Sequence, residues 1–299
     1  MTKALITGIQ GFAGSHLAEF LLSKGHTVFG LDLNLGASDH LRDIEDLLVL
    51  FECDIRDRER LYEVVSQTKP DEIYHLAAMP HVPTSFKDPR FTFEVNLIGS
   101  LNVFEAAKAV SNSIKILYVG SATEYGDVRD EEIPIDEDVP LRPTDPYSVS
   151  KVSADMLAFQ YFKSFKLHII RVRPFNHIGP RQSDEFVLSS FVKQIAEIEK
   201  GLKEPIIAVG NLEAKRDFSD VRDIARAYWL AVQKGEPGEA YNISSGKAIS
   251  IKELLERLLN MSSKEIQVEQ DLTKLRPVDV PILVGESGKF TKQTGWSRE

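Results

Sequence analysis

The chain has 299 residues, of which 42% are hydrophobic and 27% charged, and its formal net charge is −9. This length suits one large domain or two closely packed ones, and the acidic balance disfavours a nucleic-acid-binding protein, which usually carries a basic excess. The single cysteine, Cys53, excludes an internal disulfide framework and fits a reducing compartment.

The first residues, MTKALITG, enter an apolar, strand-like run at once, without the apolar core of a signal peptide. Nowhere does an apolar stretch approach the ~20 residues that a membrane span needs. We therefore expect a cytoplasmic protein with no membrane partner and no nucleic-acid partner.

Short apolar runs alternate along the chain with segments of helical spacing. The runs expected to form buried strands are 3–7, 27–31, 47–52, 72–78, 115–121 and 167–173. The segments expected to form helices are 12–23, 58–68, 91–109 and 147–163. Such alternation predicts right-handed βαβ units and a parallel sheet covered on both faces, which is the α/β, doubly wound Rossmann fold.

The later part of the chain is less regular, with clusters of Pro and Gly near 174–180, 201–210 and 276–288. We expect two parts. Residues 1–173 with 221–248 would form an NAD(P)-binding Rossmann domain, and residues 174–220 with 249–299 a smaller substrate-binding lobe.

The segment TGIQGFAGSHL (7–17) follows the first strand and opens the first helix, with glycines at positions 8, 11 and 14. Gly8 permits a tight turn, Gly11 lets the backbone approach a pyrophosphate, and Gly14 lets helix and strand pack closely. The N-terminus of the helix then offers free N–H groups to the pyrophosphate. This arrangement predicts dinucleotide binding.

Asp32 ends the second strand, about 20 residues past the glycine loop, where a carboxylate can bind the adenosine ribose 2′-hydroxyl. A carboxylate there repels a 2′-phosphate, so NAD(H) is favoured, with NADP(H) also possible. Asp54 could close the adenine end, and the small Ala77 and Ala78 would let a cofactor lie against the backbone. Further cofactor contacts are expected at Phe12, Ile55, Leu76 and Pro174.

Tyr147 and Lys151 lie four residues apart in DPYSVSKVSADMLAF, and hence on one face of the expected helix. An ammonium group near a phenol lowers the phenol pKa from its usual value of about 10, which would let Tyr147 exchange a proton near neutrality. Hydride transfer at an alcohol or ketone carbon needs such a group. Ser121, at the end of the preceding strand, can hydrogen-bond the same oxygen.

The motifs TGIQGFAG, HLAA, GSATEYG, YSVSK and RPFNHIGPRQ together resemble the extended short-chain dehydrogenase/reductase family, which acts on nucleotide sugars. The resemblance covers essentially the whole chain. It implies Ser121, Tyr147 and Lys151 as the catalytic residues, with Tyr147 and Lys151 also contacting the cofactor. It implies a nucleotide-diphosphate sugar as substrate, with Asn176 near the diphosphate.

Four further segments, 81–89, 176–187, 209–223 and 275–281, are similar to the branch of the family that contains GDP-mannose 4,6-dehydratase and the 4-keto reductase that follows it. This resemblance implies that Ser85 faces the hexose, that Arg216 and Arg276 hold the diphosphate, and that Asp279 lies near the nucleotide ribose. The guanidinium fork of Arg matches phosphate oxygens. Thr123, Val187 and Asn211 complete the expected substrate contacts.

The loop GSATEYGD (120–127) bears on the reaction. In the dehydratases of this family the loop reads like TxExYG, and its Glu removes the sugar C5 proton. Aligned on Tyr-Gly, that position is Thr123 here, and Glu124 comes one residue later. In an extended segment, one step turns a side chain to the opposite face, so we expect Glu124 to face away from the sugar.

The absence of a carboxylate at position 123 to remove the C5 proton, and the sequence NHIGP at 176–180, favour a reductase of a 4-keto sugar. A nucleotide-sugar 4-epimerase is the alternative, a 4,6-dehydratase comes third, and a non-catalytic NAD-sensing regulator would be expected to have lost the Tyr–Lys pair.

The seven histidines show no metal-ligand spacing, so no metal is expected. By resemblance, helices 91–109 and 147–163 would pair across a homodimer, although burial in the core explains the same apolar pattern.

Overall fold

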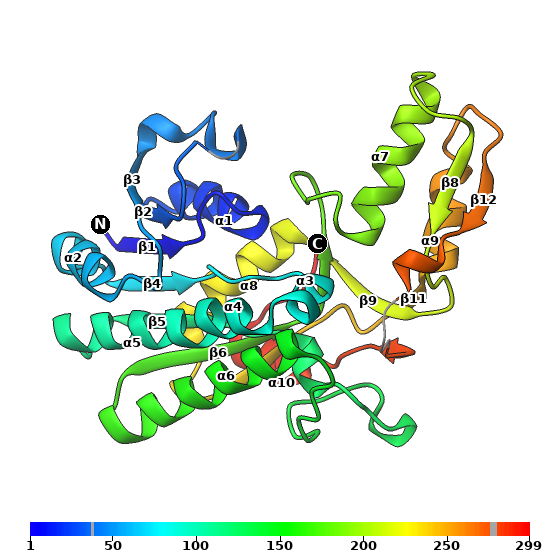
Figure 1. The fold of residues 1–299 in the computed structure, drawn as a ribbon. Helices are drawn as coiled ribbons and strands as arrows, with labels where there is room; N and C mark the ends of the chain where they lie inside the picture. Colours follow the sequence, from blue (N-terminus) through cyan, green and yellow to red (C-terminus); the bar gives the residue numbers. More distant parts are fainter. Residues whose placement is uncertain (37–38, 276–279) are drawn as a thin grey trace.

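A seven-stranded parallel sheet forms the centre of the computed structural model, which describes residues 1–36, 39–275 and 280–299 (Figure 1). The strand order is β10-β6-β5-β4-β1-β2-β3. The bounds are β1 Lys3–Thr7, β2 Thr27–Asp32, β3 Leu48–Glu52, β4 Glu72–His75, β5 Lys115–Val119, β6 His168–Pro174 and β10 Ala240–Ile243. The order reverses between β1 and β4, as in a Rossmann fold, so the expected fold class is confirmed.

Two of the strands end earlier than the sequence predicted. Strand β4 stops at His75 and β5 at Val119, whereas we expected runs to 78 and 121. The residues beyond each strand turn away from the ladder as loops at the carboxyl edge of the sheet. These loops carry several of the expected site residues.

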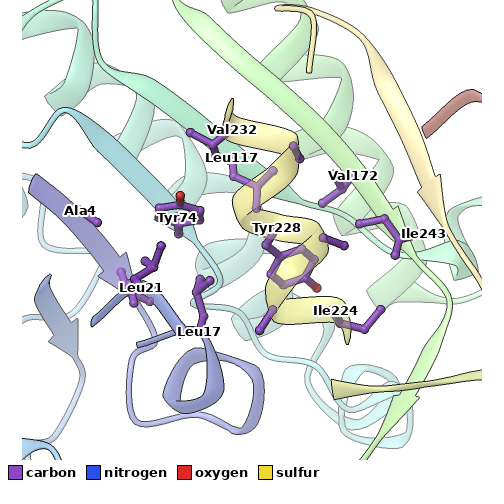
Figure 2. Close-up of a cluster of buried hydrophobic side chains, with 14 of the residues drawn as sticks. Ala4, Leu17, Leu21, Tyr74, Leu117, Val172, Ile224, Tyr228, Val232 and Ile243 are labelled. Carbon is purple, nitrogen blue, oxygen red and sulfur yellow. The ribbon is translucent and has the colours of Figure 1, made fainter. Parts of the chain in front are cut away.

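Helices cover both faces of the sheet. Apolar side chains of α1 (Phe12–Ser23) and α8 (Val221–Lys234) pack on one face, where Tyr228, Ile224 and Leu17 meet Leu117 and Val172 of the strands (Figure 2). On the other face, a second core holds side chains of α2 (Arg58–Thr68), α5 (Gly99–Val110) and α6 (Pro146–Phe165). This coverage explains why the strands read as continuous apolar runs.

The helix expected over 91–109 is not one regular α-helix. It begins as α4 (Pro89–Phe93), passes through a π-helical segment at Glu94–Ile98, and continues as α5. Asn96 lies in the wide turn, and its side chain bonds the Met79 backbone on both sides, accepting from N–H at 2.8 Å and donating to the carbonyl at 3.2 Å. Such turns are frequent at functional sites, and this one fixes the chain after β4.

A second group of elements lies at the right of Figure 1, away from the main sheet. Helices α7 (Val187–Glu199) and α9 (Ile251–Leu259) share an apolar core with β8 (Ile206–Val209), and β8 pairs with the exposed β12 (Gln267–Gln270) in a two-stranded sheet. A small sheet adjoins them, formed by β7 (Asn176–Ile178), β9 (Lys215–Asp220), β11 (Ala248–Ser250) and β13 (Ile282–Leu283).

The division into a nucleotide-binding domain and a substrate lobe stays a prediction, but the last helix bears on it. Helix α10 (Gly288–Thr294) packs on β10 and α8, and Phe290 and Trp296 belong to the first core. The chain thus returns to the main sheet at its end.

Within the residues that the structure describes, no helix combines the length and the apolar character required to cross a bilayer.

Candidate active site

Most of the expected cofactor and catalytic residues lie at the carboxyl edge of the parallel sheet, either at the ends of β2 and β6 or in the segments that follow β1, β3, β4 and β5. Tyr147 and Lys151 lie on α6. Ligands of doubly wound sheets bind at this edge, beside the point where the strand order reverses. Of the substrate residues expected from the later segments, Asn176 and Arg216 lie on the small sheet, Val187 begins α7, and Asn211 lies in the loop between β8 and β9.

The glycine loop has the geometry that a pyrophosphate requires. Gly8 has a φ angle of +73°, which residues other than glycine rarely adopt. A Cβ at this position would lie 2.9 Å from the Ala77 nitrogen. Gly11 is the N-cap of α1 and has no side chain to satisfy the N–H groups of the first turn. That turn carries no acidic residue and includes Phe12 and Gly14, the latter directly against the Gly8 carbonyl. The N-terminus of α1 therefore suits an anion.

Asp32 stands at the end of β2, next to the glycine loop. Its Oδ2 accepts the Gln10 backbone N–H at 2.9 Å, and its Oδ1 accepts the Leu33 N–H at 2.9 Å. Each carboxylate oxygen keeps a second lone pair, and the side chain is only half-buried. The carboxylate can therefore accept hydroxyl groups of a ribose.

Charged side chains surround Asp54, which we expected at the adenine end of the cofactor. Asp54 faces Arg56, with Oδ2 at 2.6 Å from Nη2, and this contact lowers the pKa of the Asp54 carboxyl. A surface hollow of about 470 Å³ lies here, between this pair, Asp57, Glu94 and Ile98. Ile55, between Asp54 and Arg56 in the chain, is almost fully buried.

The chain after β4 is held by a polar cluster that the sequence reasoning missed. The Thr7 hydroxyl accepts the N–H groups of Leu76 (3.2 Å) and Ala77 (3.1 Å), and its oxygen lies 2.8 Å from His75 Nδ1. Burial lowers the pKa of His75 to about 3, so the ring is neutral. Ala78 follows in the same half-buried stretch. Pro174 is buried and ends β6, which lies on the other side of β5 from β4.

Tyr147 and Ser121 are brought together by the start of α6. The side chain of Asp145 caps this helix by accepting the Ser148 N–H at 2.8 Å, and Pro146 occupies its first position. The Tyr147 phenol is then close enough to Ser121, which follows β5, for the Ser121 side chain to oppose the rise of its pKa. Ser121 Oγ also lies 2.9 Å from Thr123 Oγ1, so two hydroxyls and one phenol meet at this point.

The expected lowering of the Tyr147 pKa is not found. Burial, which disfavours the phenolate, raises the pKa of Tyr147 to about 12 although the Ser121 side chain opposes the shift. The Lys151 amino group donates instead to the Val119 carbonyl at 2.6 Å and lies over the Tyr118 ring. Burial lowers the pKa of Lys151 to about 8, against the attraction of Glu124 and Asp155.

The loop 120–127 is not extended as we expected. Residues Ala122–Tyr125 form a turn of 3₁₀ helix, and Glu124 is fully buried beneath it. Its Oε1 accepts the Ser121 N–H at 2.8 Å and its Oε2 lies 3.2 Å from Arg173 Nε. The carboxylate thus points into the protein because it caps the 3₁₀ turn. The reason we expected, that successive side chains of an extended strand alternate between two faces, does not apply. The SATE spacing of a capping box was the signal for this arrangement.

The residues expected to bind substrate are more widely spread. Ser85 lies in α3 (Val82–Lys87), is buried, and donates to the Val82 carbonyl at 2.7 Å. Asn176, on β7, precedes His177, whose ring stacks on Phe12 of the glycine loop with centroids 5.7 Å apart. Arg216 is on the adjacent β9 and donates to the Lys215 carbonyl.

Two other expected contacts lie on the second group of elements. Val187 begins α7 and is exposed, and Asn211 accepts the Glu213 N–H at 3.0 Å. The ring of Phe186, next to Val187, lies 6.3 Å from the His81 ring at the start of α3. Arg276 and Asp279 lie outside the described residues, so their placement as substrate contacts stays a prediction.

Comparison with known proteins identifies the relatives of this chain. A sequence model of the family described as GDP-mannose 4,6 dehydratase matches residues 5–299. GDP-6-deoxy-D-mannose reductase of Pseudomonas aeruginosa is 35% identical over 300 residues, which cover 100% of this chain and 93% of that protein.

Two solved structures are similar over 100% of this chain and 94% of theirs. RMD from Pseudomonas aeruginosa, complexed with NADPH, has a TM-score of 0.85 and 32% identity. UDP-glucose 4-epimerase of Thermus thermophilus, in complex with NAD, has a TM-score of 0.89 and 28% identity.

Proposed function

The chain belongs to the GDP-mannose 4,6-dehydratase family of nucleotide-sugar enzymes, and we propose that within this family it is a 4-keto reductase. It is an oxidoreductase that acts on a nucleotide sugar with a pyridine nucleotide cofactor. The proposed substrate is of the GDP-4-dehydro-6-deoxy-D-mannose type, and the product of the GDP-D-rhamnose type. The reductase of Pseudomonas aeruginosa, 35% identical, supports this choice.

One observation carries the proposal. Beside Tyr147 the loop presents the hydroxyls of Ser121 and Thr123, 2.9 Å apart, and the Glu124 carboxylate is fully buried beneath them. Removal of a C5 proton needs a base within hydrogen-bond reach of the sugar. Reduction of a ketone needs only an acid and a donor at the carbonyl oxygen, which Tyr147 and Ser121 supply.

In the proposed reaction, Tyr147 donates its phenolic proton to the C4 carbonyl oxygen while Ser121 donates a hydrogen bond to the same oxygen. When bound, the reduced nicotinamide supplies the hydride that reaches C4. The pKa of Tyr147, raised to about 12 by burial, keeps the phenol protonated at neutral pH, which is the form that reduction requires. Buried Lys151 would hold the cofactor beside this oxygen.

The cofactor would lie along the carboxyl edge of the sheet. Its pyrophosphate fits the N–H groups at the start of α1, with Gly8, Gly11, Phe12 and Gly14 around it. Its adenosine ribose fits the carboxylate of Asp32, which favours NAD(H). The related RMD structure contains NADPH, so we keep NADP(H) as the second cofactor to test.

A 4-epimerase is the second candidate. The Thermus thermophilus epimerase contains NAD and matches the whole chain with a TM-score of 0.89. An epimerase uses the same Ser, Tyr and Lys residues and keeps its NAD bound, because the hydride returns to the sugar. Dehydration comes third because Thr123 has no carboxylate.

The test is cofactor consumption. The purified protein is mixed with GDP-4-dehydro-6-deoxymannose and either NADH or NADPH, and the loss of the reduced nicotinamide absorbance is followed. Oxidation of one cofactor for each sugar reduced supports the reductase. No oxidation, together with nicotinamide already bound to the purified protein, would point to the epimerase and to a search among UDP- and GDP-hexoses.

A further inference from the structure

A buried carboxylate lies directly behind the Ser121–Tyr147 pair and is not used in the proposed reaction. Glu124 has no exposed surface, and its Oε1 accepts the Ser121 backbone N–H at 2.8 Å. Ser121 Oγ in turn accepts the Thr123 N–H at 3.2 Å. These two bonds fix both the main chain and the side chain of Ser121.

The other oxygen of this carboxylate faces a buried arginine. Glu124 Oε2 lies 3.2 Å from Arg173 Nε, and Arg173, on β6, is only 4% exposed. Asp155 faces the same guanidinium, with Oδ1 at 3.3 Å from Nη2 and Oδ2 at 3.4 Å from Nε. Arg171 also pairs with Asp155. Burial and the nearby charge of Asp155 raise the pKa of Glu124 to about 8, although the attraction of Arg173 opposes this shift.

Asp155 connects this cluster to the catalytic helix. It lies on α6, one turn beyond Lys151 and two turns beyond Tyr147. Glu124, Arg173 and Asp155 therefore join the loop that holds Ser121 to the helix that holds the proton donor. The charges of both Glu124 and Asp155 also act on buried Lys151.

The space that the Glu124 carboxylate occupies is available because residue 120 is a glycine. A Cβ at Gly120 would overlap Glu124 Oε1 and would lie 3.1 Å from the Val172 carbonyl. The network also continues away from the site: Arg173 donates to the Tyr125 hydroxyl at 3.1 Å, which donates to Asn242 at 2.7 Å. Asn242 Nδ2 donates to the Ile135 carbonyl, next to β13 of the small sheet.

We propose that Glu124 is a positioning residue, which orients Ser121 through its backbone N–H and, through Arg173 and Asp155, fixes the Ser121 loop relative to Tyr147 and Lys151. The proposal deepens the reductase assignment and rests on it for the catalytic effect. It assigns Glu124 no contact with the sugar and no proton transfer.

Two substitutions separate its two contacts. Glu124→Gln keeps an oxygen that accepts the Ser121 N–H and replaces the oxygen that faces Arg173 with an NH₂ group, whereas Glu124→Val removes both contacts. The matched control is Glu72→Gln. Glu72 is also a buried, hydrogen-bonded glutamate, 3% exposed, but it begins β4 at the opposite edge of the same sheet, where it accepts from Tyr74 and Gln233.

A misplacement of about 1 Å at a reacting group can cost on the order of 100-fold in rate. We expect Glu124→Gln to lower kcat for ketone reduction by roughly tenfold, with KM changed by less than about threefold, and Glu124→Val to lower kcat further. Glu72→Gln should leave kcat within about twofold of the parent value, even if its melting temperature falls as much as that of the Glu124 variants. Equal kcat in the parent and all three variants would overturn the proposal. So would a loss of kcat in Glu72→Gln that matches its loss of melting temperature, as in the Glu124 variants.

Hydrogen exchange gives a readout that does not need the reaction. Deuterium uptake by a peptide covering 118–126 should rise in Glu124→Val, stay close to the parent in Glu124→Gln, and be unchanged in Glu72→Gln. Unchanged uptake in Glu124→Val would refute the contact with Ser121. If the parent protein oxidises neither NADH nor NADPH, the reductase assignment fails, and the exchange result still decides whether Glu124 holds Ser121.

Discussion

Asp32 accepts a hydrogen bond of 2.9 Å from the backbone N–H of Gln10, so the end of β2 is tied to the glycine loop. A carboxylate held in this place lies where a 2′-phosphate would come close to it. At about 4 Å, two like charges near a protein surface repel each other by up to about 4 kcal/mol. We predict that Asp32→Ser raises the ratio of kcat/KM with NADPH to kcat/KM with NADH by at least roughly tenfold.

Glu52→Gln is the control for this shift. Glu52 ends the adjacent β3 in register with Asp32, is exposed, and accepts the Leu35 N–H at 3.4 Å, so its substitution changes the local charge equally and leaves the Asp32 carboxylate in place. The ratio should then change by less than about twofold. The Asp32 assignment would be wrong if both variants moved the ratio alike, or if the parent protein already preferred NADPH strongly.

Tyr147→Phe removes the proposed proton donor and keeps the ring that packs at the start of α6. General acid catalysis contributes about 100- to 10,000-fold, so we predict a loss of kcat in that range with cofactor binding retained. Tyr161→Phe is the matched control, because Tyr161 lies on the same helix and its buried hydroxyl bonds Glu105 outside the site. A Tyr147→Phe enzyme with most of its activity would show that another group protonates the sugar oxygen.

Local pattern predicted the regular elements better than the site. Helices α1 and α2 have the bounds 12–23 and 58–68 that the apolar spacing indicated, since helical periodicity is a property of neighbouring residues. The 3₁₀ turn at 122–125 was missed because its Ser-x-x-Glu signal was interpreted as part of a strand end. The partner of Glu124 could not be predicted at all, since Arg173 comes from a strand that is distant in the sequence.

The same limit applied to the acid–base chemistry of the site. The spacing of Tyr147 and Lys151 placed both on α6, but it carried no information on how deeply each would be buried. Burial moves the Tyr147 pKa upward and the Lys151 pKa downward, and it outweighs the charge effect that the spacing suggested.

His75 gives a prediction about stability and pH. Burial lowers its pKa from 6.5 to about 3, so between these values the unfolded chain binds a proton that the folded protein does not. The contribution of His75 is therefore complete above pH 6.5 and is lost as the pH falls, by about 1.4 kcal/mol of unfolding free energy for each pH unit. Between pH 6.5 and 5, where few carboxylates titrate, the slope should be visible in urea unfolding.

His75→Gln isolates this effect. The variant should be less stable than the parent at pH 7, because it disturbs the bonds to Thr7 and Ser100. Its unfolding free energy should nevertheless fall less steeply between pH 6.5 and 5 than that of the parent. Parallel curves for the two proteins would mean that His75 is not kept neutral by the fold.

The outer face of α6 leads to a prediction about assembly. Val149, Met156 and Phe159 are 37%, 46% and 37% exposed, and they lie one or two turns apart on this helix, which packs beside α5. Burying such a side chain contributes ~1.5–3 kcal/mol, so a second copy packed on this face would stabilise a homodimer. We predict a dimer in solution, as measured by size-exclusion chromatography with light scattering.

Met156→Glu should then weaken the dimer by roughly 100-fold or more, because about 3 kcal/mol corresponds to that change in Kd and the new charge would have no partner. Met261→Glu is the control, since Met261 is 81% exposed but follows α9, far along the chain from this face. The control should leave the molar mass unchanged. A parent protein that is monomeric at micromolar concentration, or equal dissociation of both variants, would show that α5 and α6 do not form the contact between copies.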